Sequence, residues 1–141
     1  MFKRKALFVT LDAVPTVAPP AEPLIQAPAH VLDAIRDYGA RGYVIVPVLL
    51  TKQGDNASLA EYENVAHAAM HQLRRRTGAP VATVLLLTGN FDPREIWDLA
   101  RVYELDLNRS LLLTAGGRHA GLFRTAGVAR TAELSTHPNA A

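Results

Sequence analysis

The chain has 141 residues, with 15 Lys and Arg against 13 Asp and Glu, a formal net charge of +2 and a hydrophobic fraction of 49%. This length is enough for one domain with a real core, and the composition is that of an ordinary soluble globular protein. The absence of cysteine excludes disulfides, cysteine-ligated zinc and a thiol nucleophile.

The chain starts with the basic segment Met1–Lys5, which runs into the apolar segment Ala6–Leu11. This apolar run is too short for the core of an export signal or for a membrane span, and it ends at Asp12. We therefore expect a cytoplasmic protein that does not contact a membrane.

The first half of the chain alternates strand and helix patterns. Lys5–Leu11 and Tyr43–Leu50 are continuously apolar and rich in β-branched residues and leucine, which is typical of strands buried on both faces. Between them, residues 13–27 are rich in proline and predict a stiff, extended connection. Pro28–Tyr38 has apolar residues at helical spacing, so it predicts an amphipathic helix.

Ser58–Thr77 predicts a second helix, with its apolar residues on one side. It opens with the capping box Ser58-Leu-Ala-Glu61 and ends with three arginines, Arg74–Arg76, followed by Gly78. The arginines suit the negative end of a helix. We interpret them as solvated helix-end charges rather than as a nucleic-acid patch, so nucleic acid is not an expected partner.

The second half continues the alternation. Val81–Thr88 and Ser110–Thr114 predict buried strands, and Gly127–Thr131 is a shorter candidate for a fifth strand. Asp92-Pro93-Arg94-Glu95 opens a third helix, with an N-cap aspartate and proline at the first helical position, and the helix continues to Tyr103. A fourth, short helix is predicted from about Gly117 to Ala126, with Gly127 as its stop.

Alternating strands and helices imply right-handed βαβ crossovers and an α/β three-layer sandwich with a five-stranded parallel, Rossmann-like sheet. We expect a single domain over residues 1–131 and a flexible tail over residues 132–141. Ligands of such sheets bind at the carboxyl ends of the strands. The loops at 10–16, 51–56, 88–92 and 114–118 are therefore expected to carry the site.

The first of these loops carries a recognisable motif, Thr10-Leu11-Asp12-Ala13-Val14. After a buried strand, it resembles the Asp-x-Asp-Gly-Val motif of the haloacid dehalogenase (HAD)-like superfamily, in its histidinol-phosphatase and heptose-bisphosphate-phosphatase branch. The resemblance covers roughly residues 4–130. It implies a HAD-like sheet with the first strand at its centre, the second and third strands to one side, the fourth and fifth to the other, and no large cap domain.

The resemblance also assigns roles to residues. In the family, the first Asp attacks phosphorus and helps to bind magnesium, and the second is the general acid/base. Here Thr10 stands at the nucleophile position, and Asp12 is retained as a vestigial acid/base. In the alternate register Asp12 is the first Asp and Val14 the second, which loses the acid/base and shifts the strand.

The remaining motifs are also altered. The second motif matches Thr51, followed by Lys52. The resemblance implies that both bind phosphate, with a simple strand-ending turn as the alternative. Asn90, a further candidate for phosphate binding, falls where the family has its lysine. In the fourth motif, Ala115 and His119 stand at the positions of the two acids. Gly116-Gly117-Arg118 is a further candidate phosphate-binding segment, with a simple glycine turn as the alternative.

Joint replacement of the nucleophile, the lysine and the metal-binding acid predicts a catalytically impaired domain, a pseudo-phosphatase, that binds a protein partner, a second copy or a phosphorylated ligand and needs no cofactor. The first alternative is a divergent phosphohydrolase that acts on a small phosphate ester with magnesium. The second is a structural interaction protein with no small ligand. Whether the chain is an enzyme stays open, with the replaced residues favouring no.

A few other polar or aromatic residues have competing interpretations. His67 and His71, one helical turn apart with Glu63 before them, have metal-ligand spacing but are interpreted as a solvated helix face. Asp92 is interpreted as a helix N-cap, and Trp97 as a core or interface residue rather than a ligand-stacking one.

Overall fold

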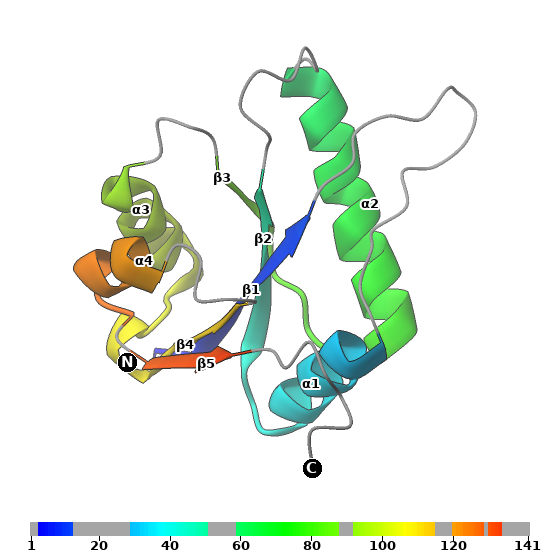
Figure 1. Ribbon diagram of the computed structural model, residues 1–141, viewed down its shortest axis with the longest axis horizontal. Helices are drawn as coiled ribbons and strands as arrows, with labels where there is room; N and C mark the ends of the chain where they lie inside the picture. The colour runs from blue at the N-terminus through cyan, green and yellow to red at the C-terminus, as the bar shows by residue number, and fades with distance from the viewer. Residues whose placement is uncertain are drawn as a thin grey trace.

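The computed structural model describes residues 3–12, 29–50, 59–87, 92–114, 120–128 and 130–133. Strands and helices alternate along them (Figure 1). The elements are β1 (Ala6–Asp12), α1 (Ala29–Ala40), β2 (Val44–Leu50), α2 (Leu59–Thr77), β3 (Leu85–Leu87), α3 (Pro93–Tyr103), a short 3-10 helix η1 (Leu107–Arg109), β4 (Leu111–Thr114), α4 (Ala120–Ala126) and β5 (Arg130–Glu133).

The five strands form one sheet in the order β3-β2-β1-β4-β5. Each neighbouring pair is parallel. The predicted fold class and strand order are therefore confirmed, with β1 at the centre. The described residues contain no separate cap domain, and none of their helices has the length and hydropathy of a membrane span.

Helices cover both faces of the sheet, with α1 and α2 on one side and α3 and α4 on the other (Figure 1). The odd-numbered residues of β1, such as Leu7 and Val9, pack in the core with α1 and α2. The even-numbered Ala6 and Phe8 pack with α3 and α4, and the Phe8 ring lies 5.2 Å from that of Phe123. Because both faces are buried, the strand is continuously apolar, as its sequence indicated.

Two of the described helix ends lie at the capping residues that the sequence predicted. The Asp92 side chain accepts a hydrogen bond from the Arg94 backbone N–H at 3.0 Å, with Pro93 as the first helical residue. α2 ends at Thr77, and Gly78 adopts a positive φ of 70° while its N–H donates to the Arg74 carbonyl. The capping box at Ser58 lies outside the described residues.

The third strand is shorter than predicted: β3 covers only Leu85–Leu87, and Val81 makes an isolated bridge to Ile45. The reason lies opposite, at Pro47 of β2, which has no backbone N–H for the ladder. Ile45 pairs with Val81 and Val48 pairs with Leu85, so the β3 side contains one extra residue across from Pro47. This local bulge separates the bridge from the strand.

The fifth strand is displaced from its predicted position at Gly127–Thr131. The backbone N–H groups of Gly127 and Val128 donate to the carbonyls of Arg124 and Phe123 and so terminate α4, with Gly127 at a φ of 116°. These two residues therefore belong to the helix end, and pairing with β4 begins at Arg130.

Candidate functional site

The carboxyl ends of the parallel strands meet at one edge of the sheet, where the motif residues of β1 and β4 lie. β1 ends at Asp12, which is in register with Leu50, the last residue of β2. β4 ends at Thr114. The backbone ladder between β1 and β4 reaches Val9 and Leu113, one residue before Thr10 and Thr114.

Beyond that last ladder pair, side chains connect the two strands. The Thr10 hydroxyl lies 3.2 Å from Thr114 Oγ1 and 3.5 Å from the Leu113 carbonyl oxygen, and it donates toward them. Thr10 is 6% exposed and Thr114 only 1% exposed. The nucleophile position of the resemblance therefore holds a buried, neutral hydroxyl that is already engaged with the neighbouring strand.

Asp12 follows Thr10 by two residues on β1. Because side chains alternate along a strand, Thr10 lies on the same face of the sheet as Phe8. That face carries Phe8 and Leu112, which pack with α3 and α4. Asp12 is the last residue of β1, and its role in a site remains a prediction from the sequence motif.

The other predicted site residues lie outside the described residues. These are Thr51, Lys52, Asn90, Ala115 and Arg118, together with the glycines before Arg118. Their roles remain predictions from the sequence motifs.

Magnesium in such a site needs several oxygen ligands, preferably carboxylates and water. At the carboxyl edge of β1 and β4, the described side chains that meet are two threonine hydroxyls, and the Thr10 hydroxyl is directed at Thr114 and Leu113 rather than at a cation. These residues do not fit a magnesium site of the family type.

Asp92 is interpreted correctly from the sequence as a cap. The backbone hydrogen bond from Arg94, followed by the side-chain hydrogen bond from the Arg94 guanidinium, lowers the pKa of the Asp92 carboxyl. The same ion pair, at 3.0 Å, raises the pKa of Arg94. The Asp92 carboxylate is therefore already hydrogen-bonded at the start of its own helix.

The two histidines of α2 lie on the solvent-exposed side of the helix. His67 and His71 are exposed, as is Glu63, which is the solvated helix face that the sequence indicated. Within the described ranges, no group of three or more His, Cys, Asp or Glu side chains could hold a metal ion.

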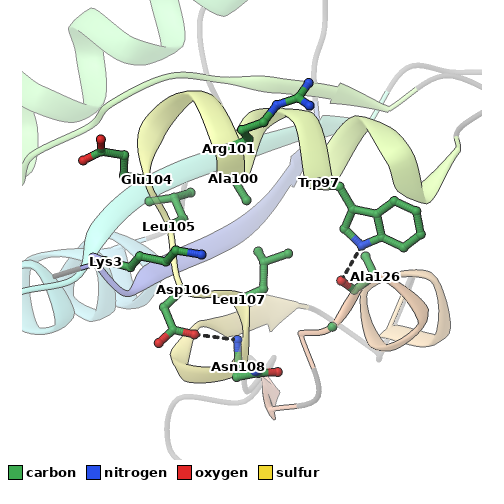
Figure 2. Close-up of a pocket in the computed structure, with 11 residues that line it drawn as sticks. Lys3, Trp97, Ala100, Arg101, Glu104, Leu105, Asp106, Leu107, Asn108 and Ala126 are labelled. Atoms are coloured by element: carbon green, nitrogen blue, oxygen red, sulfur yellow. Dashed lines mark hydrogen bonds between the residues drawn. The ribbon is translucent and has the colours of Figure 1, made fainter. Parts of the chain in front are cut away.

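A hollow of about 480 Å³ lies at the opposite, amino-terminal edge of the sheet, which the sequence interpretation did not consider. Figure 2 shows Trp97 and Ala126 at one end of it and Lys3 with Glu104 at the other. Trp97 is 47% exposed, so it is not a core residue, and its Nε1 donates to the Ala126 carbonyl at 2.7 Å. The sequence pattern points to the loops that follow strands, and this region carries no comparable signal.

No protein-family model and no curated protein matches the sequence. Solved structures do. A HAD-like protein from Mesorhizobium loti, proposed to be a phosphatase, superposes with a TM-score of 0.70 at 22% identity, over 96% of this chain and 77% of the other. The chain has a HAD-like fold.

Two further HAD-like neighbours are D,D-heptose 1,7-bisphosphate phosphatases. The enzyme from B. bronchiseptica, solved with magnesium and phosphate, has a TM-score of 0.58 at 17% identity, over 86% of this chain and 76% of the other. The enzyme from Burkholderia thailandensis has a TM-score of 0.57 at 20% identity, over 87% and 74%. The likeness to HAD-like phosphatases, including the heptose-bisphosphate branch, is thus confirmed at the level of the fold.

Proposed function

We propose that this chain is a catalytically impaired HAD-like domain that acts through binding, of a protein partner or of a phosphorylated ligand, and does not turn over phosphate esters. The observation that carries the proposal is the Thr10–Thr114 contact. It occupies the part of the sheet edge where the HAD family holds its nucleophile beside its metal-binding acid.

Thr10 is a poor replacement for a carboxylate nucleophile. A threonine hydroxyl needs a base to attack phosphorus, and its phosphate ester is stable, so turnover would stop after one transfer. The Thr10 hydroxyl is also buried and donates within the sheet, toward Leu113 and Thr114. Loss of the nucleophile in a covalent mechanism lowers the rate by several orders of magnitude.

Positioning and charge stabilisation supply most of the catalysis in phosphoryl transfer. With Thr10 in place of the nucleophilic acid and Ala115 in place of the metal-binding acid, the chain has few negative oxygens to hold a cation against a phosphoryl group. Binding without turnover is the function that such an edge supports.

The test is a turnover assay of the purified protein with magnesium and a panel of small phosphate esters. We expect no hydrolysis above that of a Thr10→Val control. Enzyme-like turnover that is abolished by Asp12→Asn would overturn the proposal in favour of a divergent phosphohydrolase, because Asp12 is the one motif acid retained at the end of β1.

A calorimetric titration with inorganic phosphate and sugar phosphates tests the binding half of the proposal. Saturable binding that is lost in Thr51→Val or Arg118→Gln supports a phosphorylated ligand at the carboxyl edge. Absence of binding, together with a stable second protein retained on the purified chain, supports a protein partner instead. Absence of both would contradict the proposal and favour a purely structural role.

A further inference from the structure

A second hollow, of about 320 Å³, lies at the amino-terminal edge of the sheet, away from Thr10 and Thr114. It lies where β2 begins and where the chain passes from α2 toward β3. Arg4, just before β1, and Arg74, in the last turn of α2, both line it, together with Val44, Pro80 and Val81. The sequence separates these two arginines by 70 positions, and the fold brings them to one cavity.

Neutral backbone oxygens, rather than carboxylates, hold both guanidinium groups in position. Arg74 Nε and Nη2 donate to the Val81 carbonyl at 3.1 and 2.6 Å. Arg4 Nη2 donates to the Tyr103 carbonyl at 3.3 Å. These contacts use only some of the five N–H donors of each group and do not neutralise its charge.

Among the described residues, no carboxylate balances the positive charge of Arg4 or Arg74. The ion pairs of the described carboxylates involve Arg36, Arg41, Arg94 and Arg101, and none of them includes Arg4 or Arg74. Arg75 and Arg76 follow Arg74 and are exposed, and Lys5 lies over the Tyr43 ring at 4.5 Å. The nearby acids Glu104 and Asp106 line the other hollow, beside Lys3.

We propose that the hollow between Arg4 and Arg74 is an anion site that binds the phosphoryl group of a small phosphate ester or polyphosphate. Guanidinium groups match phosphate oxygens with paired hydrogen bonds. The Arg74 guanidinium is held at Val81, which lines the hollow, and Arg4 lines it from the start of β1. The volume lies at the lower end of the range of small-molecule pockets, which suits a phosphoryl group with a small substituent. This site is independent of the proposed function, because it lies at the opposite edge of the sheet.

The test is calorimetric titration of the full chain with inorganic pyrophosphate, and separately with a short oligothymidylate, at low and at physiological salt. Arg4→Gln and Arg74→Gln remove one guanidinium each from the hollow. Arg75→Gln, next to Arg74 on the same helix, and Arg124→Gln, exposed on α4, remove the same charge elsewhere. Because the Arg74 side chain also supports Val81, thermal unfolding of each variant is measured, and Arg4→Gln gives a second, less structural probe.

We expect saturable binding of one pyrophosphate, weakened at least about tenfold in Arg4→Gln and in Arg74→Gln. The Arg75→Gln and Arg124→Gln variants should bind within about twofold of the parent. Equal weakening in all four variants, with the oligothymidylate preferred, would mean a diffuse basic surface for nucleic acid and would overturn the site. So would an absence of pyrophosphate binding by the folded parent chain.

Discussion

Thr10 of β1 donates to Thr114 of β4 across 3.2 Å, so the two central strands are joined at their carboxyl ends by a pair of buried hydroxyls. In the proposed correspondence with HAD phosphatases, this part of the edge matches the one that attracts a cation. Here it is built like the rest of a core, with a donor and an acceptor matched to each other. Stability measurements can therefore examine the same contact that the activity assay addresses.

Thr10→Asp should destabilise the fold by about 2 kcal/mol or more at pH 7, because it places a carboxylate where a neutral hydroxyl is buried. Burial would raise the pKa of the introduced acid above its unfolded value of about 3.9. The deficit relative to the parent should therefore shrink as the pH falls toward 4, because the folded form then keeps the acid protonated. Urea unfolding at pH 7 and pH 4.5 measures this difference.

Thr10→Asn is the matched control, because asparagine has the same shape as aspartate but no charge. Its loss of stability relative to the parent should therefore not depend on pH. Addition of magnesium decides the interpretation. If Thr10→Asp were as stable as the parent and gained further stability from magnesium, the edge would still be able to hold a cation, and the proposed loss of the metal site would be wrong.

Ser110→Ala should lower the free energy of unfolding by about 1–3 kcal/mol. The buried Ser110 hydroxyl accepts the Ala6 backbone N–H at 2.9 Å and donates to the Asp106 carbonyl at 2.7 Å, so its removal leaves a buried donor unsatisfied. Thr125→Ala, which removes an exposed hydroxyl bonded to the Gly121 carbonyl, should change stability by no more than about 0.5 kcal/mol. Chemical denaturation measures both variants, and equal losses in the free energy of unfolding would contradict this prediction.

Two helical glycines should respond in opposite directions to alanine. A Cβ at Gly39 of α1 would lie 2.8 Å from the Ala79 Cβ, so Gly39→Ala should cost about 1–3 kcal/mol by overpacking. A Cβ at Gly121 of α4 meets no atom within 4 Å, so Gly121→Ala should stabilise the protein by about 0.5–1 kcal/mol. Thermal unfolding of the two variants gives the signs, and stabilisation by Gly39→Ala would refute the packing of α1 against Ala79.

Asp92→Ala should destabilise α3, because the Asp92 carboxylate accepts the Arg94 N–H and holds its guanidinium. Since these contacts lower the pKa of Asp92, their contribution is present above the unfolded pKa and is lost as the pH falls through the folded value. The difference between parent and variant should thus narrow in strong acid. Asp92→Asn keeps a neutral cap, so its stability should vary less with pH below 4.

The sequence predicted the sheet well because its signals were local and strong. The apolar run of β1 and the Asp92-Pro93 and Gly127 helix signals each act within a few residues, so they hold in any tertiary context. The error in β3 had a long-range cause, since Pro47 affects a partner that only the fold places beside it. The error in β5 arose because Gly127 and Val128 serve two neighbouring elements, and the helix end takes their N–H groups.

The candidate site was predictable only in its strand residues. Thr10 was assigned from its spacing to Asp12, and in the structure its hydroxyl lies 3.2 Å from Thr114 Oγ1 at the end of β4. The partnership of Arg4 with Arg74 could not be derived, because it depends on how the start of β1 lies relative to the end of α2. Spacing along the chain contains no information on such a pair.

Trp97 has a consequence for any solution experiment on this chain. It is the only tryptophan, it is about half exposed, and its indole N–H is fixed to the last turn of α4. Its fluorescence therefore follows the docking of α4 on α3 and the filling of the neighbouring hollow, not the collapse of the central sheet. A ligand in the hollow that Trp97 lines should be detected by quenching of this one fluorophore.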